Sequence, residues 1–408
     1  MRRLLCLDGL RGLLAFYVML SHSVPFAIAP SWVASLFVHG GAAVDVFFVL
    51  SGLVIVQSLA SFDYQARPFL IARVARIYPV FLVVFALAIA VQPLHTGFGR
   101  MTWIGLDSPA RYIWSEGWPK DWGLDLMTHL TMTHGLFPDG MQPYMWVSFL
   151  GAAWSLSTEW QFYVLVVIIG TRLGRGDAGL CRLAALFLLI SAAAVAWHMV
   201  APDYWQFSRA FLPNKAQYFA LGVASAVVVH RGSTAMRFYV AVLATCMALS
   251  GLQGGVDKLL PPLIWTGCLA AQLHPGSAVL RPVATALSSR PLVWLGAVSY
   301  CIYLVNEPVL KVVGVALTLA TGGDAGLFTT FWLPAAVSLP VLAAWWLHVW
   351  IEAPALRRGR AIARREMAGV PVSAGGGGGR GGARCVGRRD GCAAGANRLL
   401  ETRFDSQI

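Results

Sequence analysis

Long apolar runs separated by short polar segments set the pattern of this sequence. The runs are about 16 to 25 residues long, which matches the roughly 20 residues that an α-helix needs to cross the hydrocarbon layer of a bilayer. They predict membrane spans near residues 10–29, 41–59, 78–92, 147–170, 183–200, 216–230, 238–253, 259–273, 292–318 and 327–351. The predicted fold is therefore an all-α integral membrane protein, a bundle of about ten transmembrane helices.

The composition of the chain favours the same prediction. Hydrophobic residues make up 57% of the 408 positions and charged residues only 12%, whereas a soluble domain usually carries about 25% charged residues. The alternative is a large soluble core with buried helices. Ten such runs would leave little polar chain to cover that core, so the composition indicates a membrane protein.

The basic residues are distributed unevenly over the segments between the predicted spans. If the N-terminus is cytoplasmic and the spans alternate, only Arg100, Arg111, Lys120, Arg209, Lys215 and Lys258 lie outside, and most arginines lie inside. This asymmetry follows the positive-inside rule. It predicts cytoplasmic termini and a multi-pass protein of the cell inner (cytoplasmic) membrane, with the lipid bilayer as a partner. The net charge of +12 then reflects topology and predicts no nucleic-acid partner.

Two regions follow from these observations, a transmembrane domain over residues 1–357 and a basic Gly/Arg-rich cytoplasmic tail over 358–408. The tail contains an unbroken glycine run from Gly375 to Gly379. Such a composition cannot bury enough apolar area to offset the entropy of ordering, so disorder is expected. The seven cysteines are scattered and predict neither a metal site nor a disulfide framework.

The longest polar segment, residues 93–146, is predicted to be extracytoplasmic and is rich in aromatic residues. Among them are Trp103, Tyr112, Trp114, Trp118, Trp122, Tyr144 and Trp146. One interpretation is an aromatic belt with short helices at the membrane interface. The other is a platform for a sugar, because aromatic faces pack against the apolar faces of pyranose rings. The two interpretations are compatible.

Two ionisable residues occur within the first predicted span. Arg11 and His22 are eleven residues apart, so their side chains point the same way along a helix and are separated by about 16 Å. Arg11 lies at the cytoplasmic edge, where it can hold an anion. His22 lies deep, where a neutral imidazole can accept a proton from a hydroxyl group. Alternatively, His22 is a structural residue that is satisfied by hydrogen bonds between helices.

Further polar residues occur in the second predicted span and in the segment that follows it. Asp45, in the run GGAAVDVFFVLSGLVI, is expected at a depth similar to that of His22. It could orient the imidazole, or it could make an isolated polar contact between helices. Arg73 and Arg76, in ARVARIYP, share one helical face. They are either ordinary topology signals or a fork of guanidinium groups for phosphate.

Two later runs contain polar groups in predicted spans. Glu159 lies in WSLSTEWQFY, and it is either functional or paired with an arginine. The run SYCIYLVNEP supplies Tyr300, Tyr303, Asn306 and Glu307. Its proline, residue 308, is expected to disturb the helix and to leave a carbonyl group free to line a cavity.

These motifs, in this order, resemble the acyltransferase-3 family of membrane O-acyltransferases, which includes O-antigen and exopolysaccharide O-acetylases. The resemblance covers residues from about Leu7 to Pro354. The opening LDGLRGLLAFYVMLSH matches the arginine, ten-residue gap and histidine of the family. The other four runs match its second-helix, double-arginine, tryptophan–serine–leucine–glutamate and late tyrosine motifs. Asn306 departs from the pattern, since many members have histidine there, and Trp160 stands where a second glutamate is common.

The resemblance implies transfer of an acyl group, often acetyl, from cytoplasmic acyl-CoA to a hydroxyl group of a carbohydrate, a lipid-linked sugar or a similar acceptor. His22 would be the general base, supported by Asp45 or Glu159. The donor-binding residues would be Arg11, Arg73, Arg76, Tyr300 and Tyr303. No cofactor is expected to be bound permanently, and acyl-CoA, with acetyl-CoA as the usual form, is a donor substrate.

A proton-coupled secondary transporter is the competing interpretation. His22, Asp45 and Glu159 would then form a proton relay. The sequence shows no paired halves and no matching helices broken by glycine or proline, and a transporter has no reason to bind CoA. The motifs therefore favour acyl transfer.

Overall fold

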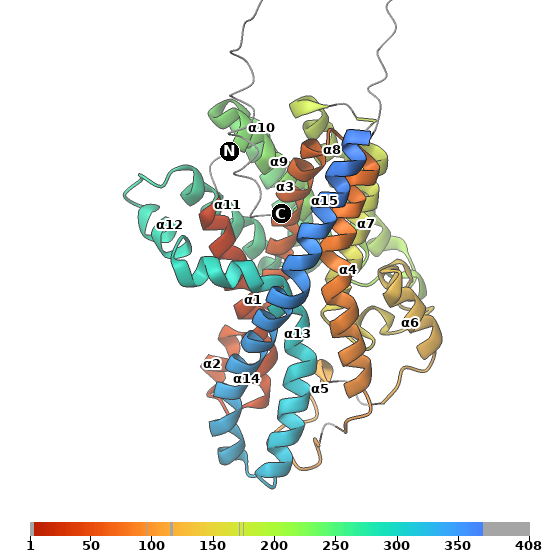
Figure 1. The fold of residues 1–408 in the computed structure, drawn as a ribbon, viewed down its shortest axis with the longest axis vertical. Coiled ribbons are helices and arrows are strands. Elements are labelled where there is room, and N and C mark those ends of the chain that lie inside the picture. Colours follow the sequence, from red (N-terminus) through yellow and green to blue (C-terminus); the bar gives the residue numbers. More distant parts are fainter. Residues whose placement is uncertain (1–3, 96, 115–116, 171, 174, 370–408) are drawn as a thin grey trace, which may run out of the picture.

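A computed structural model describes residues 4–369 except 96, 115–116, 171 and 174, and the regular secondary structure of this part of the chain is helical (Figure 1). The long helices are α1 (Leu5–Ser23), α3 (Gly40–Ser61), α4 (Ala66–Val91), α7 (Ala153–Gly170), α8 (Gly176–Val200), α9 (Ala216–Arg231), α10 (Met236–Gly254), α11 (Leu260–Leu273), α13 (Arg290–Ala320), α14 (Ala325–Leu347) and α15 (Ala353–Gly369). Shorter helices are α2 (Ser31–Leu36), α5 (Ala110–Ile113), α6 (Trp122–Leu130) and α12 (Arg281–Leu287). The described residues contain no named strand, only one isolated bridge between Pro138 and Phe207.

Every predicted span coincides with one of these long helices. Seven segments of the described chain are long and apolar enough to cross a membrane, and one of them, residues 212–254, contains both α9 and α10. The protein is therefore a multi-pass membrane protein. Helices α7 and α11 fall outside those seven segments, so the count of about ten spans and the cytoplasmic position of the termini remain predictions.

Helix α4 is longer than the third predicted span, residues 78–92. Helix α4 begins at Ala66 and includes Arg73, Arg76 and Pro79. The predicted span was too short because Arg73 and Arg76 lowered the apolar character of a segment that nevertheless lies inside the bundle. The proline in the late tyrosine motif likewise leaves its helix unbroken, because α13 continues through Pro308 to Ala320.

Helices α1 and α13 pack side by side with a very close backbone approach. A Cβ atom at Gly12 would lie 2.5 Å from the backbone nitrogen of Gly296, and a Cβ atom at Gly296 would lie 2.1 Å from the carbonyl oxygen of Asp8. Only glycine fits at such a contact. The two glycines therefore fix the relative position of the helices that carry His22 and the late tyrosine motif.

The last described helix extends past the predicted domain boundary at residue 357. Helix α15 packs along α4, as the blue and orange ribbons in Figure 1 show. The side chain of Ala363 is buried, and Gly359 lies against Ala75. Residues 358–369 of the predicted tail thus belong to this helix. The rest of the tail, 370–408, lies outside the described residues.

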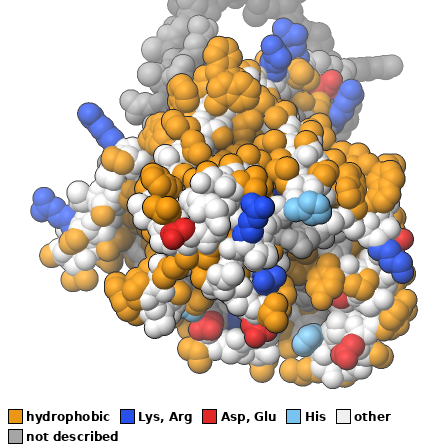
Figure 2. Space-filling model, turned by 90° about the horizontal axis from the view of Figure 1, so that it is seen from below, with side chains coloured by type: hydrophobic (Ala, Val, Ile, Leu, Met, Phe, Trp, Pro, Cys, Tyr) orange, Lys and Arg blue, Asp and Glu red, His pale blue; other side chains and the backbone are white. Residues whose placement is uncertain are grey.

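The segment between α4 and α7 contains α5 and α6. Helix α5 lies at the end of the bundle where α2 and the turn between α13 and α14 also lie, and this end is here called the α5 end (Figure 1). Trp114 is buried in a small apolar cluster with Phe26 and Trp332, whereas Tyr112 is exposed. Figure 2 views the α5 end and shows charged and histidine side chains scattered among hydrophobic and uncharged ones. The aromatic residues of this segment therefore divide between a packed core and the surface.

Candidate active site

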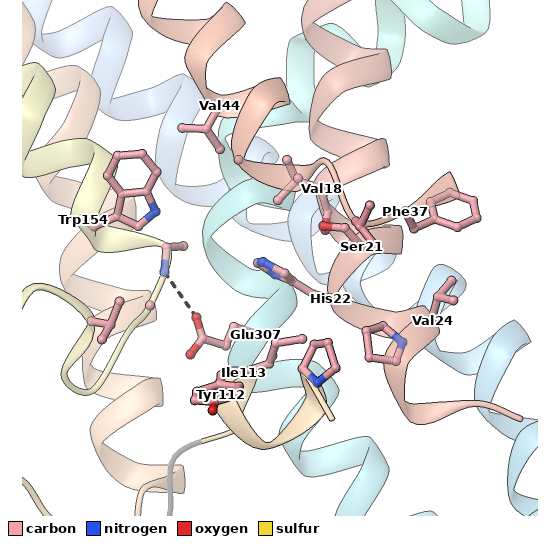
Figure 3. A pocket seen from close by; sticks show the side chains of 18 of the residues that line it. Val18, Ser21, His22, Val24, Phe37, Val44, Tyr112, Ile113, Trp154 and Glu307 are labelled. Atoms are coloured by element: carbon pink, nitrogen blue, oxygen red, sulfur yellow. Dashed lines mark hydrogen bonds between the residues drawn. The ribbon is translucent and has the colours of Figure 1, made fainter. Parts of the chain in front are cut away.

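Most of the predicted site residues line one of two neighbouring cavities inside the bundle. The larger, here called the His22 cavity, has a volume of about 660 Å³ and opens near the α5 end (Figure 3). Its polar and aromatic lining comprises Ser21, His22, Tyr112, Trp146, Trp154, Arg209, Tyr303 and Glu307. Figure 3 shows His22 from α1 and Glu307 from α13 extending toward the same space.

The smaller cavity, here called the arginine cavity, has a volume of about 120 Å³. Its polar lining comprises Arg11, Ser51, Arg73, Arg76, Ser155, Glu159, Tyr163, Ser299, Tyr300 and Tyr303. Val44 and Tyr303 line both cavities. The two cavities are therefore adjacent and share a wall at Tyr303, with the arginines on one side and His22 on the other.

The hydrogen bonds of Asn306 determine which nitrogen of His22 carries the proton. The side-chain nitrogen of Asn306 donates to the carbonyl groups of Ile302 (3.0 Å) and Tyr303 (2.7 Å). Its oxygen, Oδ1, therefore faces His22 Nδ1 at 2.8 Å, and an oxygen can only accept there. His22 must carry its proton on Nδ1, which leaves the lone pair on Nε2 available as a base.

Arg11 lies on the same side of α1 as His22, as the spacing predicted, because both side chains contact α13. Its Nη2 donates to the carbonyl oxygen of Gly296 at 2.7 Å, and its Nε donates to Ser299 Oγ at 3.1 Å. Neither partner is charged. The guanidinium is thus positioned by α13 without an anion to neutralise it in these bonds.

Arg73 and Arg76 are within the bundle rather than in a loop that follows the second span. Arg73 is only 4% exposed, and its Nη2 donates to Ser58 Oγ at 3.1 Å. Its Nε has no hydrogen-bond partner among the described residues. Arg76 forms an ion pair with the buried Glu352 and stacks over the ring of Tyr300, with 5.4 Å between Cζ and the ring centre. Topology signalling alone does not explain two arginines in such an environment.

Glu159 lines the arginine cavity and does not contact an arginine through any hydrogen bond in the described chain. Ser51 Oγ donates to its Oε1 at 2.6 Å, and the hydroxyl group of Tyr163 donates to its Oε2 at 2.9 Å. The lining of this cavity includes three guanidinium groups, those of Arg11, Arg73 and Arg76, and one carboxylate, that of Glu159. Its net charge favours an anionic ligand.

Asp45 lies in a different environment from the one its sequence position predicted. Its Oδ1 accepts from Lys215 Nζ at 2.6 Å, and its Oδ2 lies 3.5 Å from Lys258 Nζ. It lines neither cavity, and the hydrogen-bond partner of His22 Nδ1 is Asn306. The expectation that Asp45 orients the imidazole is therefore wrong in geometry, because helix packing turns this carboxylate toward η5 (Leu212–Lys215).

Two residues at the site were not assigned a role from the sequence. Asn306, which the sequence marked only as a departure from the family pattern, orients His22. Glu307, the next residue, lines the His22 cavity, and its Oε2 accepts from the backbone N–H of Ala152 at 3.2 Å. Neither contact could be found from the sequence, since both join segments far apart in the chain. Tyr300 donates its hydroxyl group to the carbonyl oxygen of Ile77 at 2.7 Å.

The fold and the two cavities describe a multi-pass membrane protein in which a partly buried histidine lies beside a pocket lined by arginines. The chain belongs to the acyltransferase-3 family, because the model of that family, described as an acyltransferase domain, matches residues 4–350. The protein is thus an enzyme that transfers acyl groups. Within the described residues, no group of histidine, cysteine, aspartate or glutamate side chains could hold a metal ion.

Two relatives illustrate the range of this family. Acyltransferase MdmB of Streptomyces mycarofaciens is 26% identical over 404 residues, which cover 90% of this chain and 95% of MdmB. The Bacillus subtilis protein named "Putative peptidoglycan O-acetyltransferase YrhL" is 25% identical over 346 residues, which cover 74% of this chain and 48% of that protein. No solved structure matches the chain.

Proposed function

We propose that this protein transfers an acyl group, normally acetyl, from acyl-CoA to a hydroxyl group of a carbohydrate or similar acceptor, with His22 as the general base. The observation that carries the proposal is the wall that the two cavities share at Tyr303. One cavity offers cationic side chains suited to an anionic donor. The other offers a base with a defined lone pair and aromatic side chains suited to a sugar.

The donor would enter through the arginine cavity. Its three guanidinium groups and the unpartnered Nε of Arg73 attract the anionic carrier and can donate to carbonyl oxygens of its arm. A cavity of about 120 Å³ is smaller than typical sites for drug-sized ligands. It therefore accommodates the thioester end of the donor, and the nucleotide end would remain outside it.

The acceptor would occupy the His22 cavity, whose volume of about 660 Å³ suits one or two sugar rings. Nε2 of His22 would remove the proton of the acceptor hydroxyl group as its oxygen attacks the thioester carbonyl carbon. The C–S bond then breaks, and the imidazolium returns the proton to the departing thiolate of CoA. A new ester, free CoA and neutral His22 result, so atoms and charges balance.

The same proposal assigns the ends of the molecule. The arginine cavity would face the cytoplasm, where acyl-CoA is made, and the α5 end would face the opposite side of the inner membrane. The uneven distribution of basic residues between the spans supports this orientation. The name of YrhL, "Putative peptidoglycan O-acetyltransferase", supports a carbohydrate acceptor.

The test is acetyl-CoA consumption by the purified protein in nanodiscs, measured as release of free CoA with and without added glycans. His22→Ala should reduce the rate by at least about 100-fold, because general-base catalysis is commonly worth 10²–10⁴. His274→Ala, which changes an exposed histidine outside both cavities, is the matched control. A folded His22→Ala variant with full activity would overturn the assignment of the base.

Arg73 provides the donor arm of the same experiment. Arg73→Ala should raise the KM for acetyl-CoA, while Arg237→Ala, at an exposed arginine on α10, should leave it unchanged. If neither acetyl-CoA nor any of several longer acyl-CoAs binds or turns over, the donor is not acyl-CoA. Other activated acyl donors would then have to be tested.

A further inference from the structure

The His22 cavity contains a cationic side chain, Arg209, that the transfer step does not use. Arg209 lies between α8 and η5 and lines the cavity together with His22. Its Cζ lies 5.1 Å from the ring centre of Trp146 and 5.9 Å from that of Trp154. The two indole rings hold the guanidinium by cation–π interactions. Arg209 is an exposed residue, so a ligand in the cavity can reach its guanidinium group.

The backbone beside Arg209 is fixed to α7. The carbonyl oxygen of Ala210 accepts from Thr158 Oγ1 at 3.0 Å and from Gln161 Nε2 at 2.9 Å. The backbone N–H of Leu212 donates to Gln161 Oε1 at 2.9 Å. Helix α7 also carries Trp154, so the arginine and one of its indole partners are attached to the same helix.

The second indole partner is held by a strained segment. Trp146 lies in η3 (Met145–Val147), between Tyr144 at φ 63° and Phe149 at φ 61°. Aromatic residues rarely adopt this left-handed conformation, and the surrounding structure must enforce it at a cost of about 1–3 kcal/mol each. The surrounding structure therefore fixes the backbone on both sides of Trp146, which lines the cavity next to the guanidinium.

The charge of Arg209 is not neutralised by the protein. Among the described residues, no carboxylate lies within ion-pair distance of its guanidinium group, although other arginines have such partners. Glu307 lines the same cavity, but its carboxylate accepts from the backbone of Ala152. The two indole rings contact the guanidinium through cation–π interactions, which do not use its N–H groups as hydrogen-bond donors. Those N–H groups can therefore donate to an oxyanion.

We infer that Arg209 binds an oxyanion, a carboxylate or a phosphate, on the acceptor, and that the His22 cavity is therefore selective for acidic acceptors. Glycans that contain uronic acids and sugar phosphates both carry such a group. The inference rests on the proposed function, because it takes the His22 cavity as the acceptor site. Trp146 and the exposed Tyr112 offer apolar faces to any sugar ring. Arg209 would give a sugar that carries a carboxylate or a phosphate a higher affinity than a neutral sugar.

Binding without a donor tests this inference independently of catalysis. The wild-type protein in nanodiscs is titrated by calorimetry with methyl glucuronide, glucose 1-phosphate and the neutral methyl glucoside. At least one anionic probe should bind about 10- to 100-fold more tightly than the glucoside, since hydrogen bonds to charged groups are worth about 1.5–3 kcal/mol. Preference for the glucuronide alone indicates a carboxylate, and preference for glucose 1-phosphate alone indicates a phosphate.

Three variants separate a specific contact from a general charge effect. Arg209→Gln should remove the preference, and Arg209→Lys should keep part of it, because lysine retains the charge without the planar donor set. Arg100→Gln removes the same charge from an exposed residue that does not line the cavity. It should leave the preference unchanged.

Equal affinity for charged and neutral probes would overturn the inference, as would a preference that survives Arg209→Gln or the absence of binding up to about 20 mM probe. The acetyl-transfer assay reports separately on the proposed function. If the anionic preference depends on Arg209 but no acetyl group is transferred from acetyl-CoA, the anion site stands and the proposed reaction fails.

Discussion

The hydrogen bond between Asn306 and His22 makes a quantitative prediction. Asn306→Leu keeps the approximate size of the side chain but removes the oxygen that lies 2.8 Å from Nδ1 of His22. The buried N–H of the imidazole then loses its partner, which costs about 1–3 kcal/mol. The tautomer with the proton on Nε2, which cannot act as the base, also becomes competitive. At about 1.36 kcal/mol for each factor of ten, kcat should fall about 10- to 100-fold.

The assay is acetyl-CoA turnover in nanodiscs, with kcat and KM measured separately. Asn306 lines neither cavity, so the KM for acetyl-CoA should change little. If Asn306 acts through His22, the double variant with His22→Ala and Asn306→Leu should be no slower than His22→Ala alone. Turnover by Asn306→Leu within twofold of the wild-type value would refute this reasoning. So would a further loss of rate in the double variant.

Three further predictions concern stability. Gly296→Val should lower the free energy of unfolding by at least about 1–3 kcal/mol in thermal melts, because its Cβ would lie 2.1 Å from a backbone oxygen of α1. The control, Gly267→Ala, has no atom within 4 Å of its Cβ and should be neutral or stabilising. Equal melting temperatures of the two variants would contradict this prediction. Burial lowers the pKa of His134, which lies outside the spans, from 6.5 to about 4. The folded state should therefore lose up to about 3 kcal/mol of stability as the pH falls from 6.5 toward 4. His134→Gln should reduce this pH dependence in thermal melts recorded at each pH, and an unchanged dependence would contradict the assignment. Arg76→Ala and Glu352→Ala should each cost about 3–5 kcal/mol by leaving a buried charge unpaired, and a double variant with Met and Leu should be more stable than either single variant; additive losses would contradict the pairing.

The helices could be predicted from the sequence because the apolar runs have the length that a membrane requires. The shared direction of Arg11 and His22 also follows from helical periodicity alone, and both side chains contact α13. The start of α4 could not be predicted in this way. Its arginines have the polarity of a loop, and only their burial against Ser58 and Glu352 explains why they belong to a helix inside the bundle.

Pairings between distant segments account for what the sequence did not predict. Asp45 meets Lys215, which is 170 residues away, and Arg76 meets Glu352, which is 276 residues away. Helical periodicity gives the direction of a side chain around its own helix. The neighbour it meets depends on how helices pack, and here that packing is set by close contacts such as Gly12 against Gly296. For the same reason the support of His22 was expected from Asp45 or Glu159 and comes from Asn306.

The most direct test of the account asks whether the sulfur of CoA reaches the wall that the two cavities share. Tyr303→Cys, in a background without the seven native cysteines, would be incubated with CoA disulfide and mapped by mass spectrometry. If the donor arm reaches this position, a mixed disulfide forms between CoA and Cys at position 303. A reductant should cleave this disulfide, and excess acetyl-CoA should prevent its formation. Reaction at an exposed control, Leu252→Cys, with none at position 303 would show that the donor arm does not reach His22 by this route.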